Sequence, residues 1–129
     1  MLKAQAAFSG VSVDNLEAAK EFYTTILGLR LTDDKMGLNF ELPGGGGLFV
    51  YDKPDHRAAS YTYLNFVVEN IDEAVDELTE AGVKFEVYDN MPFKQDDKGI
   101  ARGLSANQGP DIAWFKDPAD NILAIIQDK

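Results

Sequence analysis

The pattern of apolar and polar positions repeats once along the chain. Residues 8–13 and 63–68 are short, rich in Val and Phe, and each stretch runs into an acidic-Asn pair. Such stretches predict strands. The matching segments are residues 13–16 with 68–71 and, after one deletion, 27–29 with 81–83. A period of about half the chain predicts two copies of one supersecondary unit rather than a solenoid.

Helical spacing of apolar residues follows the first strand of each half. Asn70 is expected to cap the second helix, with Glu73 completing a capping box, and Asp14 or Asn15 to cap the first. A glycine ends each pattern, where a left-handed residue would stop the helix. The two apolar stripes consist of Leu16, Ala19, Tyr23, Ile26 and Leu27, and of Ile71, Ala74, Val75, Leu78 and Ala81.

Three further strands are expected after each helix, separated by Gly- and Pro-rich turns. Residues 53–60, which include Pro54 and His56, form the expected linker between the halves. The order strand–helix–three strands therefore occurs twice, although the second half offers one strand candidate too many. The candidates are 29–34, 37–43 and 47–52 in the first half, and 84–88, 100–106, 111–116 and 121–127 in the second.

Composition narrows the class of protein. The chain has 129 residues, 45% of them hydrophobic, and no cysteine, so it suits one domain without disulfides or thiolate chemistry. A net charge of −10 argues against binding nucleic acid and favours cationic ligands, or it simply keeps the surface soluble. No segment has the pattern of a signal peptide or membrane span, so we expect a cytoplasmic protein without a membrane partner.

Two segments carry a family resemblance. Residues 13–29 (VDNLEAAKEFYTTILGL) and 112–123 (IAWFKDPADNIL) resemble the opening and closing motifs of the glyoxalase / bleomycin-resistance / extradiol-dioxygenase superfamily, the vicinal oxygen chelate fold. With residues 63–82, the resemblance spans nearly the whole chain. It implies an α+β fold in which two tandem βαβββ modules form one domain over residues 1–129. Mixed curved sheets would form a trough with the helices outside, and family members commonly form homodimers.

The module boundaries follow from the same resemblance. Module 1 is expected at about residues 5–53 and module 2 at about residues 61–129.

The resemblance also implies where metal ligands would lie in metal-dependent members. The four positions fall on Phe8, Tyr63, Ala124, and Leu48 or, after a shift by one, Phe49. Phe, Leu and Ala have no donor atoms and a tyrosine phenol is a poor substitute. The sequence therefore predicts no metal, no cofactor and no catalytic residues, and the single histidine, His56, is expected to be an exposed linker residue.

Strand alternation suggests what would line the trough instead. If Phe8 and Tyr63 face inward, Gly10, Ser12, Asn65, Val67 and Ala124 do so too, with Trp114 a further candidate. Arg102 could hold an anionic group of a ligand, although it could equally pair with a surface carboxylate. The aromatic residues could also simply fill the trough as core. The predicted ligand-binding residues are Phe8, Ser12, Tyr63, Asn65, Arg102 and Trp114.

Three functions remain open from the sequence. The first is a metal-free protein that binds or sequesters a small, cationic aromatic molecule, resembling the drug-resistance branch of the superfamily. The second is an enzyme, either a metal-dependent lyase, isomerase or dioxygenase, or a metal-free one whose base would be sought at Glu41 or Glu86. The third is a structural or regulatory dimer module.

Overall fold

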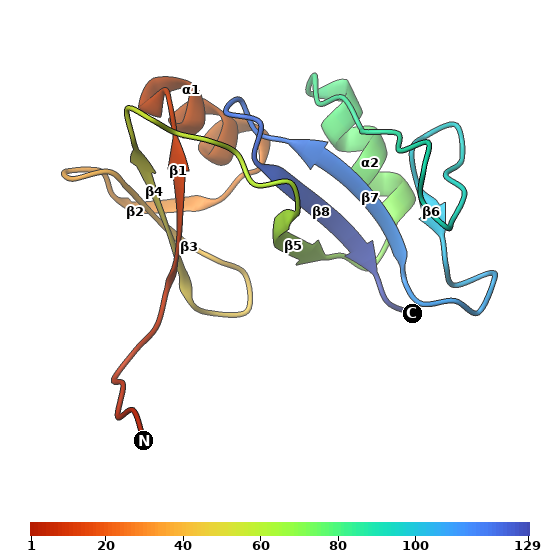
Figure 1. Ribbon diagram of the computed structural model, residues 1–129, viewed down its shortest axis with the longest axis horizontal. Coiled ribbons are helices and arrows are strands. Elements are labelled where there is room, and N and C mark those ends of the chain that lie inside the picture. Colours follow the sequence, from red (N-terminus) through yellow and green to blue (C-terminus); the bar gives the residue numbers. More distant parts are fainter. The chain divides into compact units, whose positions relative to one another are not determined.

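The computed structural model describes residues 1–129 and divides into two compact units, Met1–Ala58 and Ala59–Lys129. Each unit contains helical structure and a four-stranded sheet, as Figure 1 shows. The division falls inside the predicted linker, residues 53–60. We call the units module 1 and module 2.

Module 1 contains six elements in the predicted order. Its sheet has the strand order β1-β4-β3-β2, in which β1 runs parallel to β4 and the other pairs are antiparallel. The elements are β1 (Ser9–Val13), α1 (Leu16–Glu21), the π-helical turn η1 (Phe22–Ile26), β2 (Arg30–Asp33), β3 (Leu38–Glu41) and β4 (Gly47–Asp52).

Module 2 repeats this topology with the strand order β5-β8-β7-β6, and β5 runs parallel to β8. The first strand of each module thus lies beside the last, which confirms the predicted α+β fold with two mixed sheets. The elements are β5 (Thr62–Val67), α2 (Ile71–Glu80), β6 (Ala101–Arg102), β7 (Asp111–Lys116) and β8 (Ile122–Gln127).

The helix ends form for the reasons that the sequence indicates. Asn15 Oδ1 accepts a hydrogen bond from the Ala18 N–H at 3.0 Å, and Asn70 Oδ1 accepts one from the Glu73 N–H at 3.1 Å. Both caps satisfy an amide that the helix itself leaves without a partner. Gly28 and Gly82 follow the helices with φ of 72° and 102°, the left-handed conformation that glycine adopts without steric cost.

Three expected elements differ from the structure. The first helix widens into a π turn, which allows the consecutive Phe22 and Tyr23 both to be buried. The predicted strand 84–88 is wrong, because this segment makes only a single bridge, between Phe85 and Phe115. The predicted strand 100–106 ends at Arg102, since Gly103 turns the chain so closely past the Pro110 carbonyl that a Cβ would clash.

Each sheet buries one face beneath its own helix. The buried residues of this face are Val13, Leu38, Phe40, Leu48 and Val50 in module 1, and Ala113, Phe115, Leu123 and Ile125 in module 2, under Ile71 and Val75 of α2. We call the opposite side the open face of each sheet. Its side chains alternate with those of the buried face along each strand, and those with exposed atoms are the ones that could meet a ligand.

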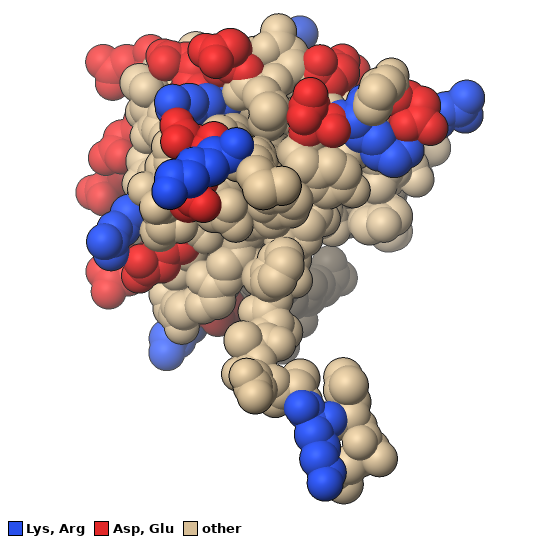
Figure 2. Space-filling model, turned by 90° about the vertical axis from the view of Figure 1, so that its left-hand side faces the viewer, with Lys and Arg blue, Asp and Glu red and all other residues tan.

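The charged side chains are distributed over the surface. In the view of Figure 2, Asp and Glu are scattered among Lys and Arg rather than gathered at one hollow. The face seen in Figure 2 thus carries carboxylates and ammonium or guanidinium groups side by side. Neither helix is long and apolar enough to cross a membrane.

Candidate functional site

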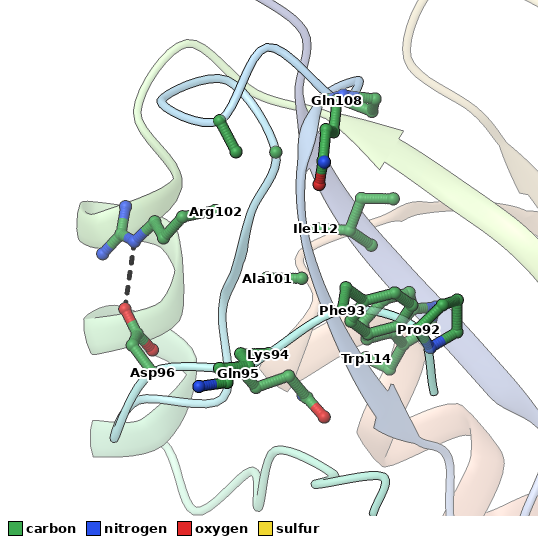
Figure 3. A pocket seen from close by; sticks show the side chains of 13 residues that line it. Pro92, Phe93, Lys94, Gln95, Asp96, Ala101, Arg102, Gln108, Ile112 and Trp114 are labelled. Carbon is green, nitrogen blue, oxygen red and sulfur yellow. Dashed lines mark hydrogen bonds and ion pairs between the residues drawn. The ribbon is translucent and has the colours of Figure 1, made fainter. Parts of the chain in front are cut away.

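Module 2 carries a cavity of about 550 Å³ beside β6 and β7. Small-molecule sites commonly have volumes of roughly 300–1,000 Å³, so a drug-sized ring system would fit. Figure 3 shows that the side chains come from β7, β6 and the loops before and after β6. The lining consists of Pro92, Phe93, Lys94, Gln95, Asp96, Ala101, Arg102, Gly103, Ala106, Gln108, Pro110, Ile112 and Trp114.

Aromatic rings form one wall of the cavity. Trp114 pairs with Ala124 in the register of β7 and β8, and Ala124 pairs with Asn65 of β5, so all three lie on the open face. The Phe93 ring stacks on Trp114 with 5.3 Å between ring centroids and 17° between planes. Tyr88 meets Trp114 edge-on at 5.7 Å. Trp114 is thus part of an aromatic group that lines the cavity, and its role in binding a ligand stays a prediction.

The loop that carries Phe93 is held at its base by one side chain. We call residues 88–94 the aromatic loop. Gln95 Oε1 accepts from the Tyr88 N–H at 2.7 Å, and Gln95 Nε2 donates to the carbonyls of Glu86 and Gly99, each at 2.8 Å. These three bonds replace the strand pairing that the segment lacks. They bring the two ends of the aromatic loop together and set Phe93 against β7.

The guanidinium of Arg102 forms hydrogen-bonded ion pairs with two carboxylates on the helix side of the cavity. Its Nη1 and Nη2 donate to the two carboxylate oxygens of Asp72 at 2.9 and 2.8 Å, and its Nε donates to Asp96 at 3.0 Å. Hydrogen bonds from Arg102, and then from Lys98, hold the pKa of the Asp72 carboxyl well below its usual range. The guanidinium, drawn with Asp96 in Figure 3, therefore has carboxylate partners, which is the alternative that the sequence allowed for this residue.

Two other predicted ligand-binding residues belong to module 1. Ser12 lies on the open face of β1, and its Oγ is 2.6 Å from His56 Nδ1. His56 is consequently half-buried, and its prediction as an exposed linker residue is wrong, because the bond draws the linker onto the sheet. Phe8 precedes β1 and is 72% exposed. Tyr63, in module 2, sits at an irregularity of register between Thr62 and Leu64.

The four positions that the resemblance assigns to metal ligands carry few donor atoms in this chain. Gly10 pairs with Phe49 just as its repeat counterpart Asn65 pairs with Ala124, so Phe49 is the counterpart of Ala124. Leu48 is 1% exposed and lies in the buried core of module 1. Phe49, Ala124 and Phe8 have no donor atom and Tyr63 has one phenol. No group of three or more His, Cys, Asp or Glu side chains is arranged to hold a metal ion.

Carboxylates that could serve as a general base are engaged elsewhere. Glu41 Oε2 lies 3.0 Å from Arg30 Nη1, and Glu86 Oε1 lies 3.5 Å from Lys116 Nζ. Both are ion pairs with partly exposed side chains, so neither carboxylate stands alone in a cavity.

Sequence reasoning missed Phe93, Tyr88 and Gln108. A strand pattern assigns facing by parity, but these residues lie in loops, where parity has no meaning. Pro92-Phe93, an apolar pair inside a polar stretch, was the only local signal. Figure 3 shows Gln108 at one end of the cavity, near Ile112, and the Phe93–Trp114 stack further along the same wall.

Together, these features define a class of protein made of two βαβββ modules with an aromatic cavity on a sheet. The sequence profile of the Glyoxalase/Bleomycin resistance protein/Dioxygenase superfamily matches residues 5–124. The chain belongs to this superfamily, as the motifs at both ends of the sequence indicated. No curated protein matches the sequence.

Solved structures share the fold over the whole chain. TnmS3, an antibiotic binding protein from Streptomyces sp. CB03234, is 24% identical, with a TM-score of 0.71 over 100% of this chain and 99% of that one. A superfamily member from Sphaerobacter thermophilus is 22% identical, with a TM-score of 0.70 over 98% and 100%. The fosfomycin resistance protein FosX from Listeria monocytogenes is 14% identical, with a TM-score of 0.69 over 99% and 96%.

Proposed function

We propose that this protein binds a small planar aromatic molecule in the cavity of module 2. The observation that carries the proposal is the Phe93–Trp114 stack, which presents flat apolar surface beside an open volume of about 550 Å³. Aromatic rings prefer offset-stacked or edge-on neighbours, and this wall offers both geometries. A ligand ring would either extend the stack or displace Phe93 from it.

The superfamily relatives support a binding role. TnmS3 is described as an antibiotic binding protein and FosX as a fosfomycin resistance protein. Binding of a small molecule is therefore a function that a protein with this fold carries elsewhere, and the cavity supplies a place for it here. Fold alone does not determine function, so the proposal depends on the cavity.

We further propose that binding needs no metal. The support is the donor set, since Phe8, Phe49 and Ala124 supply no ligand atoms and Tyr63 supplies one. Thermal unfolding against Ni²⁺, Mn²⁺, Zn²⁺ and Fe²⁺, with EDTA as the control, tests this. A saturable stabilisation by one ion that EDTA reverses would overturn the proposal and point to a metal-dependent lyase, isomerase or dioxygenase.

The experiment for the binding site uses the only tryptophan of the chain, Trp114, whose emission reports directly on the cavity. Bleomycin, the flat cation proflavine and the flat anion anthraquinone-2-sulfonate are titrated while the emission is recorded. Thermal unfolding is the second readout, because a ligand at a hundred times its Kd adds about 2.7 kcal/mol of stability. We expect at least one compound to quench Trp114 and to stabilise the fold.

Two variants test whether the compound binds at the aromatic wall of the cavity. Trp114→Leu and Phe93→Leu each remove stacking surface, and we expect each to weaken binding by roughly 3–30-fold, equivalent to about 0.7–2 kcal/mol. Calorimetry gives the affinities, since Trp114→Leu has no tryptophan emission. Tyr61→Leu is the matched control, because Tyr61 is 68% exposed and does not line the cavity. If all three variants bind the compound as tightly as the wild type does, the compound binds elsewhere.

We also propose that the protein is a homodimer, as the family resemblance implies, and that it lies in the cytoplasm.

A further inference from the structure

The charged groups that line the cavity differ in whether they are free to meet a ligand. Asp96 Oδ2 accepts from Arg102, and Asp96 Oδ1 accepts from the backbone N–H groups of Lys98 and Ile100. Arg102 is bound by Asp72 as well as Asp96. Lys94, next to the stacked Phe93, is the one charged lining residue that makes neither an ion pair nor a side-chain hydrogen bond. Its ammonium is therefore the charge that a ligand would encounter.

The net charge of the chain favours a cationic ligand, whereas the charge nearest to the cavity favours an anionic one. The chain carries −10, which favours a cation at long range. At physiological salt, however, the interaction between exposed charges is largely screened beyond about 8 Å, so the nearest unpaired group counts most. Asp96 is the only carboxylate of the cavity lining and is held by Arg102, and Asp89, on the aromatic loop, does not line the cavity. The immediate surroundings of a bound ring thus favour an anion.

We propose that the ligand of this cavity is a planar aromatic acid. Its ring packs on the wall that Trp114 and Phe93 form, and its carboxylate or sulfonate group meets the Lys94 ammonium. Gln108, at the other end of the cavity, supplies an amide that can donate to a second oxygen of the ligand. This assignment rests on the proposed function and adds the chemical class of the ligand to it.

Three matched naphthalenes test the charge while keeping the ring constant: 2-naphthoate, 2-naphthamide and 2-naphthylmethylammonium. The indole N–H of Trp114 gives a single signal in a ¹H–¹⁵N spectrum because the chain has one tryptophan. Its shift during titration yields a site-specific Kd for each probe, including weak ones. We expect the carboxylate to bind at least threefold more tightly than the amide and at least tenfold more tightly than the ammonium.

Lys94→Met keeps the aliphatic length and removes the charge. It should weaken 2-naphthoate by roughly 3–10-fold, leave 2-naphthamide within twofold, and make 2-naphthoate binding less sensitive to salt. Lys84→Met is the matched control, because Lys84 is exposed, lies outside the cavity lining and changes the net charge equally. Lys94→Gln is a second variant that removes the charge and keeps a polar side chain. The dispersion of the signals in each spectrum shows whether the variant is folded.

The outcomes separate this assignment from the binding function itself. If the Trp114 signal moves with none of the three probes, the proposed aromatic site is wrong, and the proposal of an aromatic acid as its ligand is wrong too. If the signal moves with all three probes but the ammonium or the amide binds as tightly as the carboxylate, the aromatic site is supported and the proposal that its ligand is an acid is wrong. Equal losses in Lys84→Met and Lys94→Met would also overturn the role of Lys94.

Discussion

At the scale of single residues, Arg102 shows how neighbours decide a side chain's role. An isolated arginine between glycine and alanine residues is compatible with an anion site or with a surface ion pair. Register places Arg102 opposite Asp111, and its guanidinium reaches Asp72 on α2 and Asp96 in the preceding loop. The arginine therefore ties three elements of module 2 together, and Lys94 is the lining residue whose charge has no ion-pair partner.

This network predicts a dependence of stability on pH. The pKa of Asp72 is held below its usual range by Arg102 and Lys98, whereas in the unfolded chain it returns to about 3.9. A lowered folded-state pKa stabilises the protein above the unfolded value and loses this effect as pH falls below about 4. Since the Asp72 side chain is 46% exposed, we expect Asp72→Asn to lower the free energy of unfolding by only about 1 kcal/mol at pH 7.

Urea unfolding at pH 7 and at successive values down to pH 2 measures the effect. The difference between wild type and Asp72→Asn should shrink as the pH falls below 4. Glu80→Gln, on the same helix without an ion pair, is the control that changes the net charge equally. A difference that stays constant with pH would show that the asparagine acts through packing rather than through charge.

At the scale of elements, the segment that leads into the aromatic loop has a different structure from the one that its local sequence pattern predicts. Residues 84–88 have the alternation of a strand, yet the side chain of Gln95 takes the hydrogen bonds that a neighbouring strand would take. Residues 81–100 lie between α2 and β6, whereas only residues 27–29 lie between η1 and β2. The cavity thus arises where module 2 departs from the repeat.

Removing the Gln95 side chain should loosen this loop. Gln95→Ala loses three hydrogen bonds, and we expect it to lower the free energy of unfolding by about 1–3 kcal/mol. The Tyr88 amide should exchange with solvent at least tenfold faster, as measured by hydrogen exchange, and any aromatic ligand should bind more weakly. Asn90→Ala, in the same loop, is the control. Unchanged exchange at Tyr88 would mean that the loop is held by its aromatic contacts instead.

At the scale of the whole molecule, the two modules share one topology, and each sheet ends in two edge strands. In module 2 one of them is β5, whose Val67 side chain is 66% exposed. Edge strands with exposed apolar side chains are common sites of association between chains. This feature supports the homodimer that the family resemblance implies.

Size-exclusion chromatography with light scattering tests the dimer. We expect a mass twice the 14.2 kDa of one chain, and a shift toward the monomer in Val67→Lys. Val87→Lys is the matched control, because Val87 is equally exposed but lies outside the strands. A single-chain mass for the wild type at micromolar concentration would contradict the prediction.

The sequence by itself indicated the superfamily through two motifs, and it determined the repeat, the helix caps and most of the strands, although residues 84–88 form no strand and β6 is shorter than expected. Strand alternation also placed Asn65 on the face of Ala124, and Trp114 was a further candidate for that face. The helix caps and the alternation along the strands depend on interactions between residues close together in the chain, and periodicity records such interactions directly. The superfamily follows instead from the resemblance of the motifs at residues 13–29 and 112–123. A glycine after each helix and an Asn before it are local signals of the same kind.

Only the tertiary structure decided the composition of the candidate site. Phe93 reaches Trp114 because Gln95 folds an aperiodic segment back on itself, and no period in the sequence carries that information. Likewise, His56 is drawn to Ser12 across 44 residues of chain, and Arg102 is drawn to Asp72 across 30. Contacts between side chains far apart in sequence depend on the path of the whole chain. Pattern alone could therefore name Ser12, His56 and Arg102, but it could not supply their partners and it missed Phe93 altogether.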